Sequence, residues 1–391
     1  MIKENKILFL LHLPPPVHGS SVVGLFIAES ERLNMEFKCT YVNLLASQNV
    51  AETGKINIRK LLGFVPVIFR IISTLILNRP KLCYLALTTT GAAFYKDLFL
   101  VGILKIFRIK YIYHLHNKGI SINQHKAFNR TCYRFVFKNA QVILLSKHLY
   151  PDIQSFVSES NIHICPNGIP DSFPFSKINS SETSMQDLKN QNNLANRIQD
   201  IEKSKPVQIL FLSNLIESKG VYILLDACAI LKNKNIQFKC IFIGGESDIS
   251  IGQFNERVAQ LKLNDYVNYQ GKRYGMEKYN AFAEADIFAF PTYYYYETFG
   301  LVNLEAMQQS KPIVSTFEGG IPDVIEDGIT GFLVPQKNAT ALAEKLELLI
   351  TNPELRLQMG ASGLEKYKRE FTLEIFENRL SDILHEVIEM K

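Results

Sequence analysis

Nine short apolar segments, each separated from the next by a stretch of helical or polar character, constrain the fold of this chain most. They are Lys6–Leu11, Leu82–Leu87, Lys110–His114, Gln141–Leu145, Gln208–Leu212, Phe238–Ile243, Val267–Tyr269, Ile287–Phe290 and Pro312–Ser315. Strand-length runs that alternate with helices predict parallel sheets joined by crossover helices. Ligands of such sheets bind at the carboxyl ends of the strands. The sequence therefore predicts an α/β fold with its sites in the loops that follow the strands.

The length of the chain and one polar stretch predict two domains. A chain of 391 residues with 47% hydrophobic residues is long enough to bury two cores. Residues 171–205, rich in Ser, Asn, Gln and Lys, separate the first four apolar segments from the other five. We expect Rossmann-like domains over residues 1–170 and 206–372 that face each other across a cleft, with 171–205 as a polar linker or insertion.

The segment Pro291–Glu305 carries the strongest chemical signal. It places Glu297 and Glu305 eight positions apart, on either side of a Phe-Gly turn. Because a buried strand precedes it and a helical pattern follows from Leu301, we expect Glu297 in a strand-to-helix loop and Glu305 on the second helical turn. Free amides at a helix start bind phosphate groups, and carboxylates bind sugar hydroxyls. This arrangement suits a sugar nucleotide.

The same region resembles the retaining glycosyltransferases of family 4, whose signature is two Glu residues separated by seven others. Three further stretches continue in the style of that family, namely Lys311–Val314, Gly319–Asp323 and Gly328–Pro335. The resemblance runs along roughly the whole chain and is densest over Val207–Pro335. It implies the GT-B architecture of two facing Rossmann-like domains. It also implies a last helix, within about 373–391, that crosses back to the N-terminal domain.

The resemblance assigns roles to residues on both sides of the cleft. His116 follows a strand, and its position resembles that of the family's active-site histidine. His114 would share its strand face. Lys219 would neutralise the departing diphosphate, Glu297 would orient the sugar and Glu305 would grip the ribose. Gly19, in the loop after the first strand, would approach the donor diphosphate, ahead of a helix from about Ser20.

Further donor contacts follow from the resemblance on the second domain. Amides around Phe299, Gly300 and Leu301 would hold the diphosphate, while Gly245 lies in a turn after a strand and Arg273 and Tyr274 lie near the base. One position departs from the family, because Asn214 stands where an Arg is expected five residues before Lys219. The leaving group would then have one cation fewer, unless Arg273 or another residue substitutes for that Arg.

Two absent motifs limit the cofactor chemistry. The chain has no G-x-G-x-x-G motif, which disfavours a nicotinamide cofactor, and no Asp-x-Asp at a strand end. We therefore expect no cofactor and no metal, with positive charge supplied by Lys219, helix dipoles and backbone amides.

The charge distribution is asymmetric. Residues 1–170 hold 20 Lys and Arg against 8 Asp and Glu, although the whole chain is only +5. Lys126, Arg130, Arg134 and Lys138 recur every four residues, a basic stripe on one helical face. This stripe is either an ordinary solvated face or a site for anionic lipid headgroups or a lipid-diphosphate acceptor. Nucleic acid is not favoured over membrane.

Apolar stretches point to a cytoplasmic protein. Leu61–Leu77 contains Pro66 and Arg70, so we expect a core or interfacial helix instead of a membrane span. The apolar run near the N-terminus is short for a signal peptide. We expect a cytoplasmic location, with peripheral attachment at the inner membrane face left open.

Together these features predict metal-independent, retaining transfer of a hexose from a UDP- or GDP-sugar to an acceptor hydroxyl. The acceptor would be a glycan or a lipid-linked precursor of a bacterial surface polysaccharide or lipopolysaccharide. A sugar-nucleotide epimerase of the same fold remains an alternative, as does a non-catalytic subunit that binds the sugar nucleotide. Asn214 is the feature that favours the last one.

Overall fold

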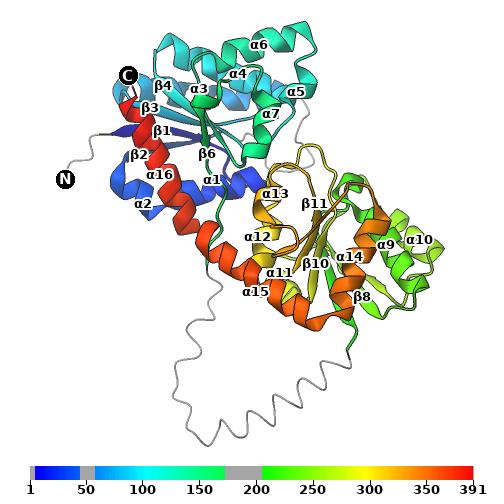
Figure 1. Ribbon diagram of the computed structural model, residues 1–391. Helices are drawn as coiled ribbons and strands as arrows, with labels where there is room; N and C mark the ends of the chain where they lie inside the picture. The colour runs from blue at the N-terminus through cyan, green and yellow to red at the C-terminus, as the bar shows by residue number, and fades with distance from the viewer. Residues whose placement is uncertain (1–4, 45–57, 172–204, 391) are drawn as a thin grey trace, which may run out of the picture.

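A computed structural model describes residues 5–44, 58–171 and 205–390 of the chain, without the side chains of residues 58–63. Residues 172–204, nearly all of the predicted linker, lie outside the described residues. The described residues form two α/β domains that meet edge to edge (Figure 1).

Within the described residues, the first domain holds a six-stranded parallel sheet in the order β2-β1-β3-β4-β5-β6. Its strands are β1 (Lys6–Leu11), β2 (Lys38–Asn43), β3 (Leu82–Leu87), β4 (Lys110–Leu115), β5 (Gln141–Leu144) and β6 (Ile162–Ile164). Strand β3 is buried along its full length. A strand buried on both sides is expected where helices cover both faces of a parallel sheet.

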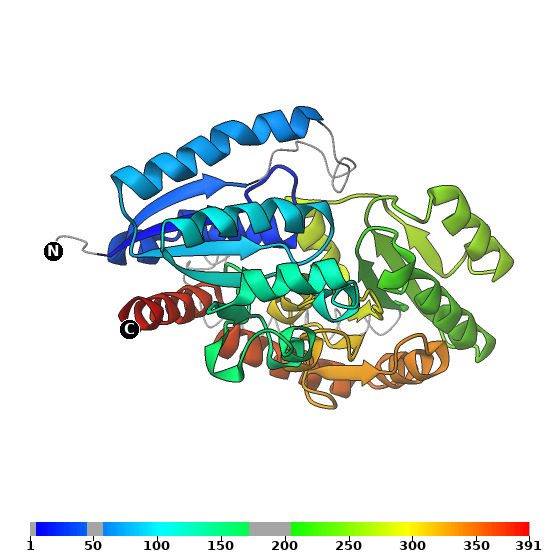
Figure 2. The ribbon, with the colours of Figure 1, turned by 90° about the horizontal axis from the view of Figure 1, so that it is seen from above.

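Alternate side chains of β1 enter two different cores. Ile7, Phe9 and Leu11 pack with α1, α2 and α16, whereas Leu8 and Leu10 pack toward α3, α4 and α6. The bounds are α1 (Gly19–Glu29), α2 (Glu31–Glu36), α3 (Ile58–Leu77), α4 (Gly91–Ile106), α6 (Ala127–Phe137) and α16 (Leu373–Glu389), with short helices α5 (Ile120–Asn123) and α7 (Tyr150–Ile153) beside them. Seen from above, α3, α4 and α6 lie side by side in one layer (Figure 2).

The second domain repeats this design with a parallel sheet of six described strands in the order β12-β11-β10-β7-β8-β9. Its strands are β7 (Val207–Leu212), β8 (Phe238–Ile243), β9 (Val267–Tyr269), β10 (Ile287–Phe290), β11 (Ile313–Thr316) and β12 (Gly331–Val334). Helix α14 packs on α9, and α15 packs on α12. The helices are α9 (Val221–Asn233), α10 (Ile251–Gln260), α11 (Gly275–Glu284), α12 (Leu301–Gln308), α13 (Ile321–Val324), α14 (Ala339–Thr351) and α15 (Pro353–Glu370).

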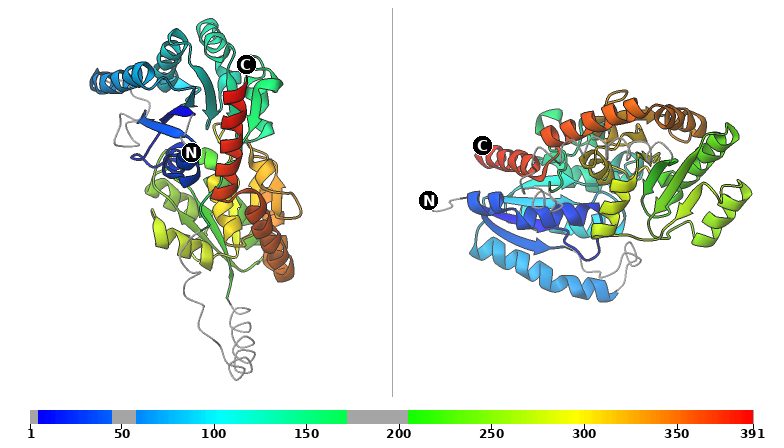
Figure 3. Two further views of the ribbon diagram at one scale, coloured as in Figure 1. Left: turned by 90° about the vertical axis from the view of Figure 1, so that its left-hand side faces the viewer. Right: turned by 90° about the horizontal axis from the view of Figure 1, so that it is seen from below.

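The C-terminal helix returns to the first domain, as predicted (Figure 3, left). Phe376, Leu380 and Leu384 of α16 are buried against β1 and its neighbours. At the far end of α16, Lys110 Nζ donates hydrogen bonds to the carbonyls of Val387 and Ile388. The last helix therefore holds the two domains together.

All nine predicted strands are present in the described residues, with ends shifted by at most one residue, but three strands were missed. Strand β2 is a half-exposed edge strand and β6 has only three residues, so neither shows a buried apolar run. The third, β12, is buried but lies inside Gly328–Pro335, which was noted only as a family resemblance. The helix predicted from about Ser20 is α1. Helix α1 begins at Gly19 because the His18 side chain caps it, accepting a hydrogen bond from the Ser21 amide.

Among the described residues, no helix has the length and apolar character needed to cross a membrane. This agrees with the prediction for Leu61–Leu77, which forms most of α3 with Pro66 inside it.

Candidate functional site

The loops that follow the strands of the two sheets contact each other at the boundary between the domains, which we call the junction. Thr298, after β10, donates a hydrogen bond from its hydroxyl to the backbone carbonyl of His116, after β4, at 3.0 Å. Gly19, at the start of α1, lies so close to Leu301 of α12 that an added Cβ would stand 4.0 Å from Leu301 Cδ1. Residues predicted from both domains therefore meet at the junction.

Glu297 and Glu305 lie where the pattern placed them, in the loop after β10 and on the second turn of α12. Helix α12 begins after Gly300, whose φ of 72° is left-handed. An added Cβ there would stand 2.7 Å from Asn303 Nδ2, so glycine is required. The turn leaves the first amides of α12 beside the loop that carries Glu297.

Lys219 pairs directly with Glu297. The Lys219 Nζ lies 2.5 Å from Glu297 Oε2, and both side chains are mostly buried, at 15% and 12% exposure. The same ammonium lies 4.5 Å from the centre of the Tyr294 ring and 5.4 Å from that of Phe290. Aromatic faces attract a partly buried cation and help to hold it in place. Two residues predicted to flank the sugar and the diphosphate thus form one unit.

The position of Lys219 depends on Gly220. Lys219 ends a 3₁₀ turn, Glu217–Lys219, and Gly220 follows in the left-handed region with φ of 91°. A Cβ on Gly220 would approach the Pro291 carbonyl oxygen to 2.2 Å. The loop after β7 can therefore pack against the end of β10 only with glycine here, and that packing brings Lys219 to Glu297.

Glu305 forms a second pair, with Lys278 of α11. Lys278 Nζ lies 2.6 Å from Glu305 Oε1, with exposures of 29% and 23%. The other oxygen, Oε2, is buried and accepts no hydrogen bond from any described residue. A buried carboxylate oxygen without a donor is costly. It is a ready acceptor for a ligand hydroxyl.

Asn214 supports a glycine turn at the end of β8. Its Oδ1 accepts a hydrogen bond from the Gly245 amide at 3.1 Å, which fixes the turn on which predicted Gly245 lies. The side chain of Lys272 extends over this turn, since a Cβ on Gly245 would stand 2.1 Å from Lys272 Cε. The structure thus places a cation beside Asn214, and that cation belongs to Lys272, which the sequence analysis did not select.

Arg273 and Tyr274 lie on the same loop as Lys272, between β9 and α11. The Gly244 amide donates to the Gly271 carbonyl at 2.9 Å, so this loop lies beside the turn after β8. Tyr274 is 68% exposed and precedes α11, which leaves its ring accessible to a flat ligand. Phe299, in contrast, is buried against Phe371, so its side chain belongs to the core and only its backbone faces the junction.

Two histidines at the end of β4 have different environments. His114 is fully buried, with its Nδ1 2.5 Å from the Tyr84 hydroxyl, and burial lowers its pKa well below the usual value. His116 follows the strand and is partly exposed at the junction. Burial, with a smaller effect of His18, lowers the pKa of His116 to about 4, so its ring is neutral near pH 7. Its position favours His116 over His114 as the ligand-facing ring.

His12 and His18 belong to the same edge of the first domain and were missed by the sequence analysis. Their rings lie 6.3 Å apart, and His12 Nδ1 lies 3.0 Å from the Ser20 hydroxyl. Burial lowers the pKa of both, that of His12 to about 3. The first domain therefore presents neutral imidazoles to the junction.

Polar contacts across the junction were also missed. Lys118 Nζ pairs with Glu318, and the Ser146 hydroxyl donates to Asp323 Oδ2 at 2.5 Å. Asp323 ends the motif Gly319–Asp323, which was noted only as a family resemblance. Because each partner lies in a different domain, nothing in the linear sequence indicates that they meet.

The four residues of the basic stripe lie on α6 or at its ends, and all four are exposed. In the described residues, no group of three or more His, Cys, Asp or Glu side chains is placed to hold a metal ion.

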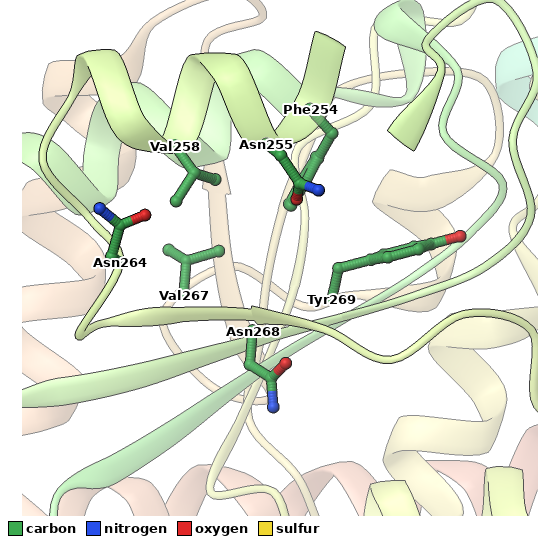
Figure 4. Close-up of a pocket in the computed structure, with 7 residues that line it drawn as sticks. All are labelled: Phe254, Asn255, Val258, Asn264, Val267, Asn268 and Tyr269. Atoms are coloured by element: carbon green, nitrogen blue, oxygen red, sulfur yellow. The ribbon is translucent and has the colours of Figure 1, made fainter. Parts of the chain in front are cut away.

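A small cavity of about 260 Å³ lies elsewhere, between α10 and β9 (Figure 4). It is lined by Phe254, Asn255, Val258, Asn264, Val267, Asn268 and Tyr269. Strand β9 is the edge strand farthest from β12, with β7 and β8 between it and β10. The cavity is therefore separate from the loop that carries Glu297.

Comparisons with known proteins agree with this geometry. Residues 193–366 match the family described as "Glycosyl transferases group 1". The amylovoran biosynthesis glycosyltransferase AmsK of Erwinia amylovora is 31% identical over 46% of this chain and 45% of its own. The capsular polysaccharide biosynthesis glycosyltransferase CapM of Staphylococcus aureus is 27% identical over 44% of each chain. The chain covers less than half the length of these curated relatives.

The fold extends over the whole chain. The crystal structure of Anabaena HepE in complex with UDP superposes with a TM-score of 0.71 at 20% identity, covering 97% of this chain and 100% of that one. HepE has also been solved with UDP-glucose, with a TM-score of 0.68 and similar coverage. This chain therefore has the GT-B fold of two facing Rossmann-like domains, and its residues 193–366 are similar to the glycosyl transferases group 1 family.

Proposed function

We propose that this chain is a retaining glycosyltransferase of family 4 that moves a hexose from a nucleoside diphosphate sugar to an acceptor hydroxyl without a metal ion. The observation that carries the proposal is the Lys219–Glu297 pair at the start of α12. The loops after β7 and β10 bring together a cation, a carboxylate and the free amides at the start of α12. These are the groups that a departing diphosphate and a sugar require.

Charge development on the leaving group explains the role of Lys219. As the bond between the anomeric carbon and the β-phosphate oxygen breaks, negative charge grows on the diphosphate. The Lys219 ammonium and the amides around Phe299, Gly300 and Leu301 stabilise that charge. Glu297, already paired with Lys219, accepts hydrogen bonds from the hexose hydroxyls and orients the ring.

Retention follows from attack on the face that the leaving group departs from. The acceptor oxygen forms its bond to the anomeric carbon on that face, and its proton passes to the departing β-phosphate oxygen. No protein nucleophile takes part. His116, neutral near pH 7, donates or accepts a hydrogen bond at a sugar hydroxyl and does not act as an acid or base in the reaction.

Donor binding uses the loops after β8, β9 and β10. Glu305 Oε2 accepts a hydrogen bond from a ribose hydroxyl, which supplies the donor that this buried oxygen lacks. Arg273 and Tyr274 lie near the base. Lys272, beside Asn214, provides the positive charge that the missing Arg would bring. The UDP and UDP-glucose complexes of HepE make a UDP-hexose the first donor to test.

The acceptor that we propose is a glycan or lipid-linked precursor of a bacterial surface polysaccharide, assembled in the cytoplasm. The names of AmsK and CapM support this class. A non-catalytic subunit that binds the sugar nucleotide is the alternative that Asn214 favours, and an epimerase would need no acceptor.

A donor panel tests the proposal. Purified protein with UDP-, GDP- or ADP-hexoses in EDTA is followed by thermal shift and by nucleotide release. We expect stabilisation by one donor and slow release that accelerates with acceptor. Glu305→Ala should abolish the shift, and Glu347→Ala should not, because Glu347 forms a similar Lys–Glu pair on the surface. No shift with any donor would refute the proposal, and a shift without release would favour the non-catalytic alternative.

A further inference from the structure

The outer surface of α3, α4 and α6, which we call the outer layer, exposes an unusual amount of apolar side chain. Its members include Ile106, Leu77, Phe69 and Phe99, with 79%, 78%, 70% and 55% of their surface accessible. The others are Val65, Ile76, Tyr95, Phe107, Phe128 and Phe135. Large exposed apolar patches usually mark sites that contact a partner or a membrane.

The exposed side chains of α4 and α6 adjoin each other. Tyr95, Phe99 and Ile106 lie on the same outward stripe of α4, the middle helix of the layer (Figure 2). The rings of Tyr95 on α4 and Phe128 on α6 are 6.1 Å apart. Lys105 of α4 lies 4.8 Å above the Phe135 ring of α6. The patch therefore extends across neighbouring helices.

The charge of this layer has one sign. Residues 58–138 contain 14 Lys and Arg but a single acidic residue, Asp97, which is fully buried. Exposed cations surround the apolar residues on all three helices and the turns after them. They are Arg70, Arg79, Arg108, Lys126, Arg130, Arg134 and Lys138. An exposed surface with many cations and no acidic side chain attracts polyanions.

The combination of charges and apolar groups identifies the partner. A nucleic acid would satisfy the cations but would offer no apolar phase to Phe69, Phe99 and Ile106. An anionic lipid bilayer offers both, because headgroup phosphates lie just above the acyl region. Aromatic rings favour that interface. We propose that the outer layer docks on an anionic bilayer, with these three side chains in the interface and the α6 cations on the phosphates.

Docking in this way would bring the junction close to the membrane. Helices α3 and α4 begin on the carboxyl side of the first sheet, which is the side of the junction. A lipid-linked acceptor would then reach the site from the bilayer. That last step rests on the proposed transfer reaction, whereas the docking itself does not.

The chain contains no tryptophan, which allows a clean probe of insertion. Phe99→Trp adds a single fluorophore on the outer layer, and Leu357→Trp adds one at a 76% exposed site on α15. With vesicles of phosphatidylcholine and phosphatidylglycerol, we expect a blue shift and quenching by brominated lipid for Phe99→Trp alone. Equal behaviour of both variants, or no response of either, would overturn the proposal.

Vesicle flotation then separates the two contributions. Removing the apolar contacts in Phe69→Ser/Phe99→Ser/Ile106→Ser should weaken binding at least tenfold, and so should Arg130→Glu/Arg134→Glu/Lys138→Glu. The control Lys234→Glu/Lys239→Glu/Lys262→Glu reverses as much charge on the second domain and should stay within twofold of wild type. Thermal unfolding midpoints confirm that each variant is folded.

Three results would contradict docking on lipid. They are equal binding to pure phosphatidylcholine, equal loss in the second-domain control, and a lipid-free dimer in which the Phe99→Trp emission is already shifted to the blue. The last would show that a second copy of this chain covers the outer layer. None depends on a sugar donor, so failure here is distinct from failure of the transfer reaction.

Discussion

The two domains present opposite chemistry to the junction. The second domain contributes two partly buried charged pairs, Lys219–Glu297 and Lys278–Glu305. The first contributes His12, His18 and His116, all with lowered pKa values and therefore neutral near pH 7. We infer that the second domain manages the charge of the donor, while the first shapes the site around the sugar and the acceptor.

The largest expected effect tests the charged side of this comparison. Lys219→Ala removes the cation that we propose stabilises the leaving diphosphate, and it leaves the Glu297 carboxylate without its partner. Loss of one preorganised electrostatic contact costs about 10²–10³-fold in kcat. Steady-state kinetics with the donor found in the panel measure it.

A matched surface pair provides the control for this variant. Lys234 Nζ lies 2.5 Å from Glu347, as Lys219 does from Glu297, but with exposures of 45% and 31%. Lys234→Ala should leave kcat unchanged, because exposed pairs are worth little. Similar losses in both variants would mean that general destabilisation, and not the leaving group, explains the effect.

A smaller effect tests whether Lys272 replaces the missing arginine. Lys272→Ala should lower kcat/KM about tenfold, the value of one charge-assisted hydrogen bond of about 1.4 kcal/mol. Asn214→Arg in the same protein should restore most of the loss, because it returns a cation to the neighbouring loop. If Lys272→Ala has normal kinetics, Asn214 is simply tolerated and the transfer needs one cation fewer.

Loss of the Lys118–Glu318 contact between the domains should lower activity less than loss of Lys219 or Lys272. Lys118→Ala breaks the pair with Glu318, although Gln336 Nε2 still donates to Glu318 Oε2 at 2.7 Å. We expect about a threefold decrease in kcat. Loss of a contact of about 0.6 kcal/mol lowers the population of molecules in which the two domains meet at the junction. The swapped variant Lys118→Glu/Glu318→Lys should recover activity. If the swapped variant recovers neither kcat nor the thermal unfolding midpoint, the Lys118–Glu318 pair does not hold the two domains together for activity.

The sequence predicts features that depend on neighbouring residues better than features that depend on long-range contacts. Strands buried on both faces, such as Leu82–Leu87 and Ile287–Phe290, carry an apolar signal that local pattern reveals, although the short buried strand β12 was missed. Glu297 and Glu305 were found because the strand, turn and helix that position them are consecutive in the chain. Lys272 was missed because its neighbour in sequence, Arg273, matched the expected type of residue.

Residues of the first domain were harder to predict because their roles depend on long-range contacts. His12 meets Ser20 and His18 only after α1 folds back toward β1, and Lys118 meets Glu318 only when both sheets are in place. The outer layer was predicted only on α6, where four cations recur at helical spacing. The apolar stripe of α4 needed the structure, since an exposed Phe99 and a buried Leu100 look alike in sequence.

The smallest expected effect concerns the neutral side of the junction. His116 has a pKa of about 4 in the folded protein, against an ordinary value of 6.5. Activity relative to a His116→Asn variant should therefore be constant from pH 6 to 9, since the ring does not titrate in that range. Rate profiles of both proteins measure this ratio.

The pH dependence of stability should also show the effect of the lowered His116 pKa, and its direction can be worked out. Between pH 6.5 and about 4 the unfolded chain binds a proton at His116 and the folded protein does not. Folding is therefore favoured most above pH 6.5 and loses this contribution as the pH falls toward 4. His116→Asn lacks the titrating group, so the difference in unfolding midpoint between wild type and variant should be constant above pH 7 and shift against wild type below pH 6.5. A shift in the opposite direction would mean that His116 is stabilised as a cation, and the first domain would then share in the charge of the donor.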